Sequence, residues 1–195
     1  MIAGLLRPTS GEVLVDGVNL EVLKKESFQQ RLGYITQEAV IFNDTIFNNV
    51  TFWSEKNEAN MKRFEAAVRK ASIDEFVRLQ TDKEDTLLGN NGINLSGGQK
   101  QRLSIARELY KEVDFLFMDE ATSALDSETE RAIQENIEAL KGQYSIIIIA
   151  HRLSTVKHAD KIVLLNKGRI EHVGHFDELM KVSPSFKKMV ELQGF

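Results

Sequence analysis

The segment that most constrains the fold begins with a serine, two glycines and a glutamine at residues 96–99. A serine followed three residues later by glutamine is typical of a capping box, in which each side chain bonds the other residue's backbone N–H at a helix start. An apolar helical pattern follows at Leu103, Ala106, Leu109 and Tyr110. We therefore predict a helix that begins at Gly97 or Gly98.

The predicted helix start has the properties of an anion site. Its first backbone N–H groups have no partner inside the helix, and the helix dipole adds partial positive charge there. Because the two glycines have no side chains, a phosphate can come close to these N–H groups. Taken alone, Ser96 and Gln99 indicate no more than an ordinary helix start.

A short apolar run, residues 113–118, follows the helix and is typical of a strand buried on both faces. The run leads into two adjacent carboxylates, Asp119 and Glu120. Ligands of open α/β sheets bind at the carboxyl ends of strands. One carboxylate can hold Mg²⁺ there, and the second can orient or deprotonate a water. The alternative for the pair alone is a solvated turn.

Together these features resemble the nucleotide-binding domain of ATP-binding cassette (ABC) transporters. Residues 95–99 match the ABC signature, residues 115–119 resemble Walker B with Glu120 in the position of the catalytic glutamate, and residues 123–126 match the D-loop. The resemblance implies an α/β fold, with a P-loop NTPase-like ABC ATPase core of mostly parallel strands flanked by helices. It also implies a helical subdomain at about residues 40–110.

The resemblance implies that one part of the site serves a second molecule. In this family two ABC ATPase domains pair head to tail, and ATP lies between the phosphate-binding loop of one domain and the signature helix of the other. Ser96, Gly97, Gly98 and Gln99, with Asp126 of the D-loop, would therefore bind the nucleotide of the partner domain.

The resemblance places the other site residues in the chain's own half-site, with ATP and Mg²⁺ as cofactors. Asp119 and Gln37 would bind Mg²⁺, and the Gln37 amide would also reach the attacking water. Glu120 would polarise that water, and His151, which follows an isoleucine-rich strand pattern, would contact the γ-phosphate. Chemistry of this kind relies on positioning and charge stabilisation.

The family's phosphate-binding loop, Gly-x-x-x-x-Gly-Lys-Ser/Thr, has no counterpart here, since none of the twelve glycines precedes a lysine. The resemblance places that loop and the first strands upstream of Met1. Residues 1–195 therefore resemble a partial ABC ATPase domain, and we expect the isolated chain to hydrolyse no ATP and to bind it weakly. We also expect unpaired strand edges and apolar surface beside the missing strand.

Composition limits the possible partners. The 195 residues suggest one domain, and a net charge of −4 gives no basic footprint for nucleic acid. Cysteine is absent, which excludes disulfides, and no apolar run approaches the ~20 residues that span a bilayer. We therefore expect no direct membrane insertion. The resemblance instead implies attachment to the cytoplasmic face of the inner membrane, through coupling helices of a transmembrane domain.

Residues 42–50 resemble a segment of exporter-type cassettes, and aromatic residues are dense around it at Phe42, Phe47, Phe52 and Trp53. One interpretation is a docking groove for a coupling helix, and the other is the core of the helical subdomain. Exporters usually carry a glutamate at the position of Asn90, so we expect one contact to the coupling helices to be lost.

Periodicity and turn residues predict the remaining elements. We expect helices at residues 1–6 (the end of a helix), 23–31, 58–70, 73–79, 127–140, 177–180 and 186–192. We expect strands at residues 12–17, 32–37 and 144–150, the last of them a core strand, and a hairpin over residues 160–173.

The implied function is ATP hydrolysis that drives an exporter-type ABC transporter. One alternative is a soluble, non-transport ABC ATPase, although such proteins carry long coiled-coil insertions between the positions of Gln37 and the signature. The other alternative is a non-catalytic interaction module that pairs with a complete cassette.

Overall fold

The computed structural model describes residues 2–119, 127–150 and 153–192, and the chain divides into two compact units, residues 1–148 and 149–195. Each unit has its own apolar core. In the described part of the chain, no helix combines the length and the apolar composition needed to cross a membrane.

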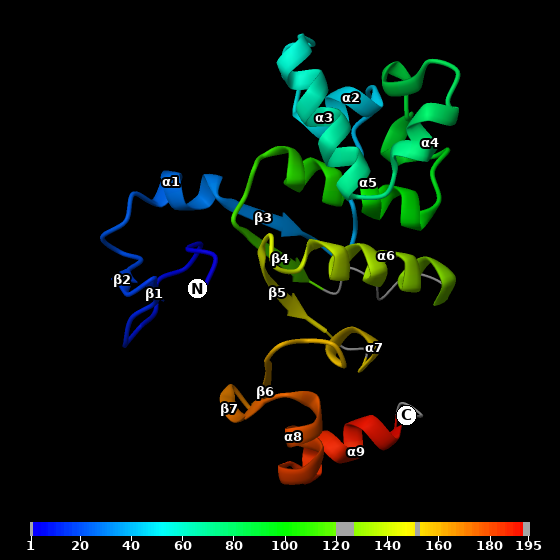
Figure 1. Ribbon diagram of the computed structural model, residues 1–195. Helices are drawn as coiled ribbons and strands as arrows, with labels where there is room; N and C mark the ends of the chain where they lie inside the picture. The colour runs from blue at the N-terminus through cyan, green and yellow to red at the C-terminus, as the bar shows by residue number, and fades with distance from the viewer. Residues whose placement is uncertain (1, 120–126, 151–152, 193–195) are drawn as a thin grey trace. The chain divides into compact units, whose positions relative to one another are not determined.

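The first unit holds a small hairpin, a three-stranded sheet and the longer helices (Figure 1). Its elements in chain order are β1 (Leu14–Val15), β2 (Val18–Asn19), α1 (Lys25–Gln30), β3 (Leu32–Ile35), α2 (Ile46–Thr51), α3 (Glu58–Lys70), α4 (Asp74–Leu79), the 3₁₀ turns η1 (Lys83–Asp85) and η2 (Asn90–Gly92), α5 (Gly97–Tyr110), β4 (Phe115–Asp119), α6 (Ser127–Leu140) and β5 (Ser145–Ile149). The helices predicted at residues 23–31, 58–70, 73–79 and 127–140 are confirmed.

The sheet has the strand order β3-β4-β5, and β3 and β4 are parallel. Their register pairs Leu32 with Phe115 and Ile35 with Met118. Between these two strands the chain passes through α2 to α5, as parallel pairing requires a long crossover. The predicted α/β fold with a parallel sheet flanked by helices is therefore confirmed, and β3 and β4 end at the same edge.

One face of the sheet is buried under α5 and α6. The buried residues of this core include Ile35, Leu116 and Met118 from the strands, Leu103 and Ala106 from α5, and Ile133 and Ile137 from α6. Gly33 lets these layers approach closely, because a Cβ at this position would lie 2.6 Å from the Leu116 side chain and 3.0 Å from the Glu108 Cβ. The apolar face predicted for the helix that follows Ser96 is confirmed.

The opposite face of the sheet is more open than strands buried on both faces would be. Tyr34 is 45% exposed, Ile147 39% and Ile149 53%, and Phe117 is half-buried. The prediction that the run 113–118 is buried on both faces was therefore wrong. The core strand predicted at residues 144–150 is β5, which packs on the core through Ile146 and Ile148 and leaves its other face open. In the described part of the chain, α5 and α6 cover the first face, whereas the second face meets α1 near Phe115.

The predicted helix end at residues 1–6 was also wrong, because residues 2–6 form turns and bends. Gly4 has φ +68°, a left-handed conformation, and Leu5 and Leu6 are 64% and 70% exposed. A short helix is marginal without a packed apolar face, and none is available to these side chains within the described residues. The strand predicted at residues 12–17 is shorter than expected and forms a hairpin with β2.

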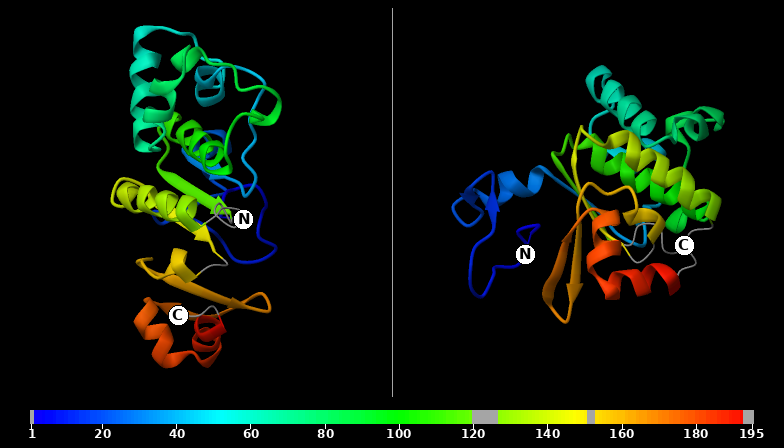
Figure 2. Two further views of the ribbon diagram at one scale, coloured as in Figure 1. Left: turned by 90° about the vertical axis from the view of Figure 1, so that its right-hand side faces the viewer. Right: turned by 60° about the horizontal axis from the view of Figure 1, so that its bottom comes forward.

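The second unit is an antiparallel hairpin packed with helices (Figure 2). Its elements are α7 (Leu153–Val156), β6 (Ile162–Asn166), β7 (Arg169–Gly174), α8 (Phe176–Val182) and α9 (Pro184–Leu192). Lys167 and Gly168, with φ of 48° and 75°, make the two-residue turn that such hairpins favour. The core contains Leu164, Leu179 and Phe186. The predicted hairpin and closing helices are confirmed.

Candidate functional site

The N-terminus of α5 has the predicted capping box. The Ser96 Oγ accepts a hydrogen bond of 3.2 Å from the Gln99 backbone N–H, and the Ser96 backbone N–H donates one of 2.9 Å to the Gln99 Oε1. Ser96 itself is extended, with φ −66° and ψ 160°, so the helix begins at Gly97. Both side chains hold the tip in shape, which leaves backbone N–H groups of the first turn for a ligand.

The charge around this tip favours an anion. The first turn of α5 carries no acidic residue, Lys100 follows directly, and Ser96 and Gly97 are exposed. The helix dipole adds partial positive charge at the same place. A phosphate oxygen that approaches from solvent would meet backbone N–H groups without having to displace a side chain.

Gln101 connects the tip of α5 to the carboxyl end of β3. Its side chain is buried, with 3% of the residue exposed, and the Nε2 lies 3.3 Å from the carbonyl oxygen of Thr36. Thr36 directly precedes Gln37, just beyond the end of β3. Since β3 and β4 are parallel, this is also the edge at which Asp119 lies. The structure thus brings the glycine tip and the acidic strand end to the same edge of the sheet.

Asp119 has a neighbour that sequence reasoning missed. The Tyr34 hydroxyl on β3 donates a hydrogen bond of 3.3 Å to the Asp119 Oδ2. Partial burial raises the pKa of Tyr34, and the charge and hydrogen bond of Asp119 raise it further, so the phenol stays in its donor form. The available signal was the position of Tyr34 near the end of a strand parallel to the one that ends in Asp119.

The donor set at this edge fits Mg²⁺ that is shared with a nucleotide. Ile35 of β3 pairs with Met118 of β4. Gln37 lies two residues beyond Ile35, and Asp119 lies one residue beyond Met118. Among the described residues, no three His, Asp or Glu side chains gather to hold a metal. Mg²⁺ is usually bound through one or two carboxylates, with phosphates and waters as its other ligands. One carboxylate and one amide oxygen match that pattern.

Three of the predicted site residues, Glu120, Asp126 and His151, lie outside the described residues. Their roles stay predictions, and so do the signature and Walker B interpretations.

Arg107 of α5 is a second residue that sequence reasoning missed. It is 5% exposed and donates hydrogen bonds of 2.7 Å to the Asn49 carbonyl and 2.8 Å to the Val40 carbonyl. Its guanidinium also lies 5.1 Å from the Phe42 ring centre and 5.3 Å from that of Phe52. Burial lowers the pKa of Arg107. Arg107 thus fixes the segment that follows Gln37. The sequence feature that could have revealed it is an arginine within the buried apolar pattern of a helix.

The aromatic residues after Gln37 separate into core and surface. Phe47 is 2% exposed and belongs to the core, whereas Phe52 and Trp53 are 45% and 51% exposed. Phe52 and Trp53 also have φ of 52° and 58°, a left-handed conformation that is uncommon for bulky residues. Neither of the two interpretations covers the whole segment, because the core takes Phe47 and leaves these two side chains at the surface.

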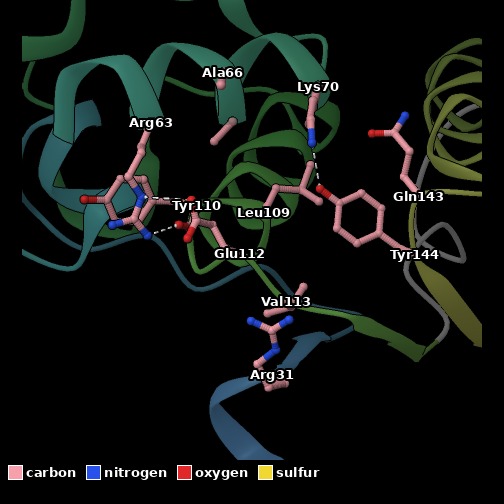
Figure 3. Close-up of a pocket in the computed structure, with 11 residues that line it drawn as sticks. Arg31, Arg63, Ala66, Lys70, Leu109, Tyr110, Glu112, Val113, Gln143 and Tyr144 are labelled. Carbon is pink, nitrogen blue, oxygen red and sulfur yellow. Dashed lines mark hydrogen bonds and ion pairs between the residues drawn. The ribbon is translucent and has the colours of Figure 1, made fainter. Parts of the chain in front are cut away.

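A cavity of about 340 Å³ lies at the opposite edge of the sheet, beside residues that precede β3, β4 and β5 (Figure 3). Its positive charges already have protein partners. Arg31 bonds the Asp114 carboxylate at 2.6 and 2.5 Å, and the Arg63 Nη2 lies 2.8 Å from the Tyr110 carbonyl. The Lys70 Nζ donates to the Tyr144 hydroxyl at 2.8 Å.

The fold and the site define a class of protein. The chain belongs to the ABC transporter family, because the sequence profile described as "ABC transporter" matches residues 1–123. The mainly parallel sheet, the crossover helices and the capped glycine tip agree with that assignment.

The chain is similar to bacterial exporters in particular. It is 44% identical over 174 residues to the "ATP-dependent lipid A-core flippase" of Burkholderia orbicola (strain AU 1054). The matched region covers 89% of this chain and 29% of that protein. It is 40% identical over 187 residues to the protein of the same description from Cupriavidus pinatubonensis (strain JMP 134 / LMG 1197), covering 95% of this chain and 32% of that protein.

Among solved structures, the "Structure of a bacterial Atm1-family ABC exporter with ATP bound" matches with a TM-score of 0.86 and 34% identity, over 100% of this chain and 34% of that one. The chain therefore spans about a third of the length of the relatives it matches.

Proposed function

We propose that the chain is the ATP-binding and hydrolysing part of an exporter-type ABC transporter and couples ATP hydrolysis to transmembrane transport. The observation that carries this proposal is the capped glycine tip of α5 at the same edge of the sheet as Asp119. A helix tip of this kind binds phosphate, and a carboxylate at a strand end can bind Mg²⁺, so this edge of the sheet offers one part to each of two nucleotide sites.

The signature tip serves the nucleotide of a second ABC ATPase domain in a head-to-tail pair. In this arrangement Ser96, Gly97, Gly98 and Gln99 bind the partner's ATP through backbone N–H groups, and Asp126 lies at the same interface. The exposure of Ser96 and Gly97 supports this role, because a partner molecule can reach them. Each domain then completes the site of the other.

The chain's own half-site uses residues at the ends of its strands. Asp119 and Gln37 hold Mg²⁺, which supplies charge neutralisation for the phosphates when it is bound. Glu120 accepts a hydrogen bond from the attacking water and polarises it, and His151 contacts the γ-phosphate. These groups act by positioning and by charge, since little covalent chemistry is required of the protein in phosphoryl transfer.

A transmembrane partner docks on Phe52 and Trp53. Their side chains are about half exposed on a segment whose backbone is held in an uncommon conformation. Strain of this kind persists where surrounding contacts enforce it, and here Trp53 donates a hydrogen bond of 2.7 Å to Asp44 while Arg107 lies near the Phe52 ring. Docking of coupling helices on this surface would place the chain at the cytoplasmic face of the inner membrane.

The catalytic proposal is tested by ATP hydrolysis in the assembled transporter that carries this chain. Glu120→Gln removes the proposed carboxylate, and we expect a loss of at least about 100-fold in turnover with ATP binding retained. Glu135→Gln is the matched control, because Glu135 is exposed on α6 and pairs with Arg131, and its turnover should stay within about twofold of the wild type. Turnover that survives in Glu120→Gln contradicts the proposal. Residues 1–195 alone should show no appreciable turnover.

The docking proposal is tested by comparing transport with hydrolysis. Trp53→Ala should reduce transport strongly and leave ATP hydrolysis by the detergent-solubilised transporter largely intact, because the residue contacts the partner and not the nucleotide. Leu79→Ala is the control, since Leu79 is also an exposed apolar residue, at 71%. Equal effects of the two substitutions on transport would contradict docking at Trp53.

A further inference from the structure

We propose that Tyr34 is a positioning residue for Asp119, whose hydroxyl holds one carboxylate oxygen and turns the other towards the metal. This inference rests on the proposed function, since it gives Tyr34 a role in the magnesium site of that function. The inference depends on the register of β3 and β4, which brings Tyr34 and Asp119 together.

The register places the two side chains within reach. Tyr34 pairs with Phe117 across the parallel strands, and Asp119 lies two residues further along β4 on the same face. Neighbouring strands lie about 4.8 Å apart and a parallel strand rises about 3.3 Å per residue, so diagonal neighbours of this kind lie about 8 Å apart, a distance that an aromatic side chain can span. Tyr34 does so, with its hydroxyl 3.3 Å from the Asp119 Oδ2.

The chemistry of this contact suits a support for a metal ligand. An ionised carboxylate only accepts hydrogen bonds, and it has two oxygens. A phenol that holds one oxygen restricts the rotation of the carboxylate and leaves the second oxygen for the metal. Such partners of metal ligands commonly alter metal affinity by about 10–100-fold. The length of this bond predicts an effect at or below the lower end of that range.

Packing is the competing explanation for Tyr34. Its ring lies on the open face of the sheet, and it contributes apolar surface there. A packing role would be kept by phenylalanine, which retains the ring and removes only the hydroxyl. A positioning role would be lost in the same substitution.

The test is the affinity of the assembled transporter for Mn²⁺ in the presence of a non-hydrolysable ATP analogue, measured by electron paramagnetic resonance. Tyr34→Phe should raise the Mn²⁺ dissociation constant about threefold to tenfold. Binding of the analogue without metal should not change. Tyr144→Phe is the matched control, because it removes a tyrosine hydroxyl at the opposite edge of the sheet, where Lys70 is its partner.

The outcomes separate this inference from the proposed function. A rise in the Mn²⁺ dissociation constant confined to Tyr34→Phe supports it. An unchanged constant overturns it, and so does an equal loss of metal-free analogue binding, which would indicate disturbed packing of the sheet. If the wild type and Tyr144→Phe show no nucleotide-dependent Mn²⁺ site, the proposed function itself fails and the role of Tyr34 fails with it.

Discussion

The two edges of the sheet use charge in opposite ways. At the edge where the strands begin, a cavity is lined by Arg31, Arg63 and Lys70. Each of these side chains already has a protein partner. At the edge where the strands end, Asp119 accepts a hydrogen bond of 3.3 Å from the Tyr34 hydroxyl. At the same edge, α5 presents a glycine tip with a first turn free of acidic side chains.

The difference shows how a fold separates stability from binding. Charges that pair with one another at the protein surface, as Arg31 and Asp114 do, add little stability. Polar groups that face solvent can bind a ligand well when buried contacts hold the segments that carry them in place. Here α5 provides that support, through Gln101 at Thr36 and Arg107 at Val40 and Asn49.

The largest expected difference between the edges is in ATP turnover. Asp119→Asn should lower turnover of the assembled transporter by at least about 100-fold, because it removes the carboxylate that we assign to the metal. Asp114→Asn removes an acid at the other edge, where its partner is Arg31. It should leave turnover and the free energy of unfolding nearly unchanged. Steady-state hydrolysis assays of both variants check this, and similar losses would contradict the comparison.

The next effect concerns stability. Arg107→Met leaves the buried Asn49 carbonyl and the partly buried Val40 carbonyl without their donor, and we expect the free energy of unfolding to fall by about 2–4 kcal/mol. Arg31→Met, at the exposed ion pair of the other edge, should cost much less. Urea unfolding followed by fluorescence measures both values. Equal losses would mean that Arg107 is no more important to the fold than a surface arginine.

A smaller effect separates the two roles of Ser96. Ser96→Ala and Asn57→Ala each remove a helix cap, and each should lower the free energy of unfolding by about 1 kcal/mol. Only Ser96→Ala should also weaken nucleotide-dependent pairing, since Asn57 caps α3, which takes no part in the proposed site. Pairing that weakens equally in both variants would assign the effect to lost stability alone.

The smallest effect is a pH dependence at Asp44. Hydrogen bonds from Asn48, the Thr45 backbone and Trp53 hold the pKa of Asp44 below its ordinary value of 3.8. A lowered folded-state pKa contributes stability that is present above the unfolded-state pKa and is lost as the pH falls through the folded-state pKa. The wild type should therefore lose stability below about pH 4 more steeply than Asp44→Asn. Acid titrations of the two proteins followed by Trp53 fluorescence measure this, and parallel curves would contradict it.

Local features of the sequence predicted the helices well and strand burial poorly. The start of α5 depends on Ser96 and Gln99, which are three residues apart, so the capping box was readable from the sequence. The exposure of Ile147 and Ile149 depends on which elements cover each face of the sheet, and an apolar run in the sequence does not specify those elements. The helix end expected at residues 1–6 failed for a similar reason, because Leu5 and Leu6 stay exposed and pack on no apolar face within the described residues.

The same limit applies to the site. The anion-binding tip was predictable because its residues are adjacent in sequence. The contact of Tyr34 with Asp119 joins residues 85 positions apart, and that of Arg107 with Val40 joins residues 67 apart. Both depend on the register and packing of segments that no local pattern specifies.

The central claim is that the tip of α5 completes the nucleotide site of a second molecule. It is tested most directly by light scattering on residues 1–195 mixed with an ABC ATPase domain that carries its own phosphate-binding loop and has its catalytic glutamate replaced by glutamine. We predict a heterodimer with MgATP that is absent without nucleotide and absent in Ser96→Arg, whose side chain would occupy the phosphate position. A heterodimer that forms equally well without ATP or with Ser96→Arg, or no heterodimer at all, would contradict the claim.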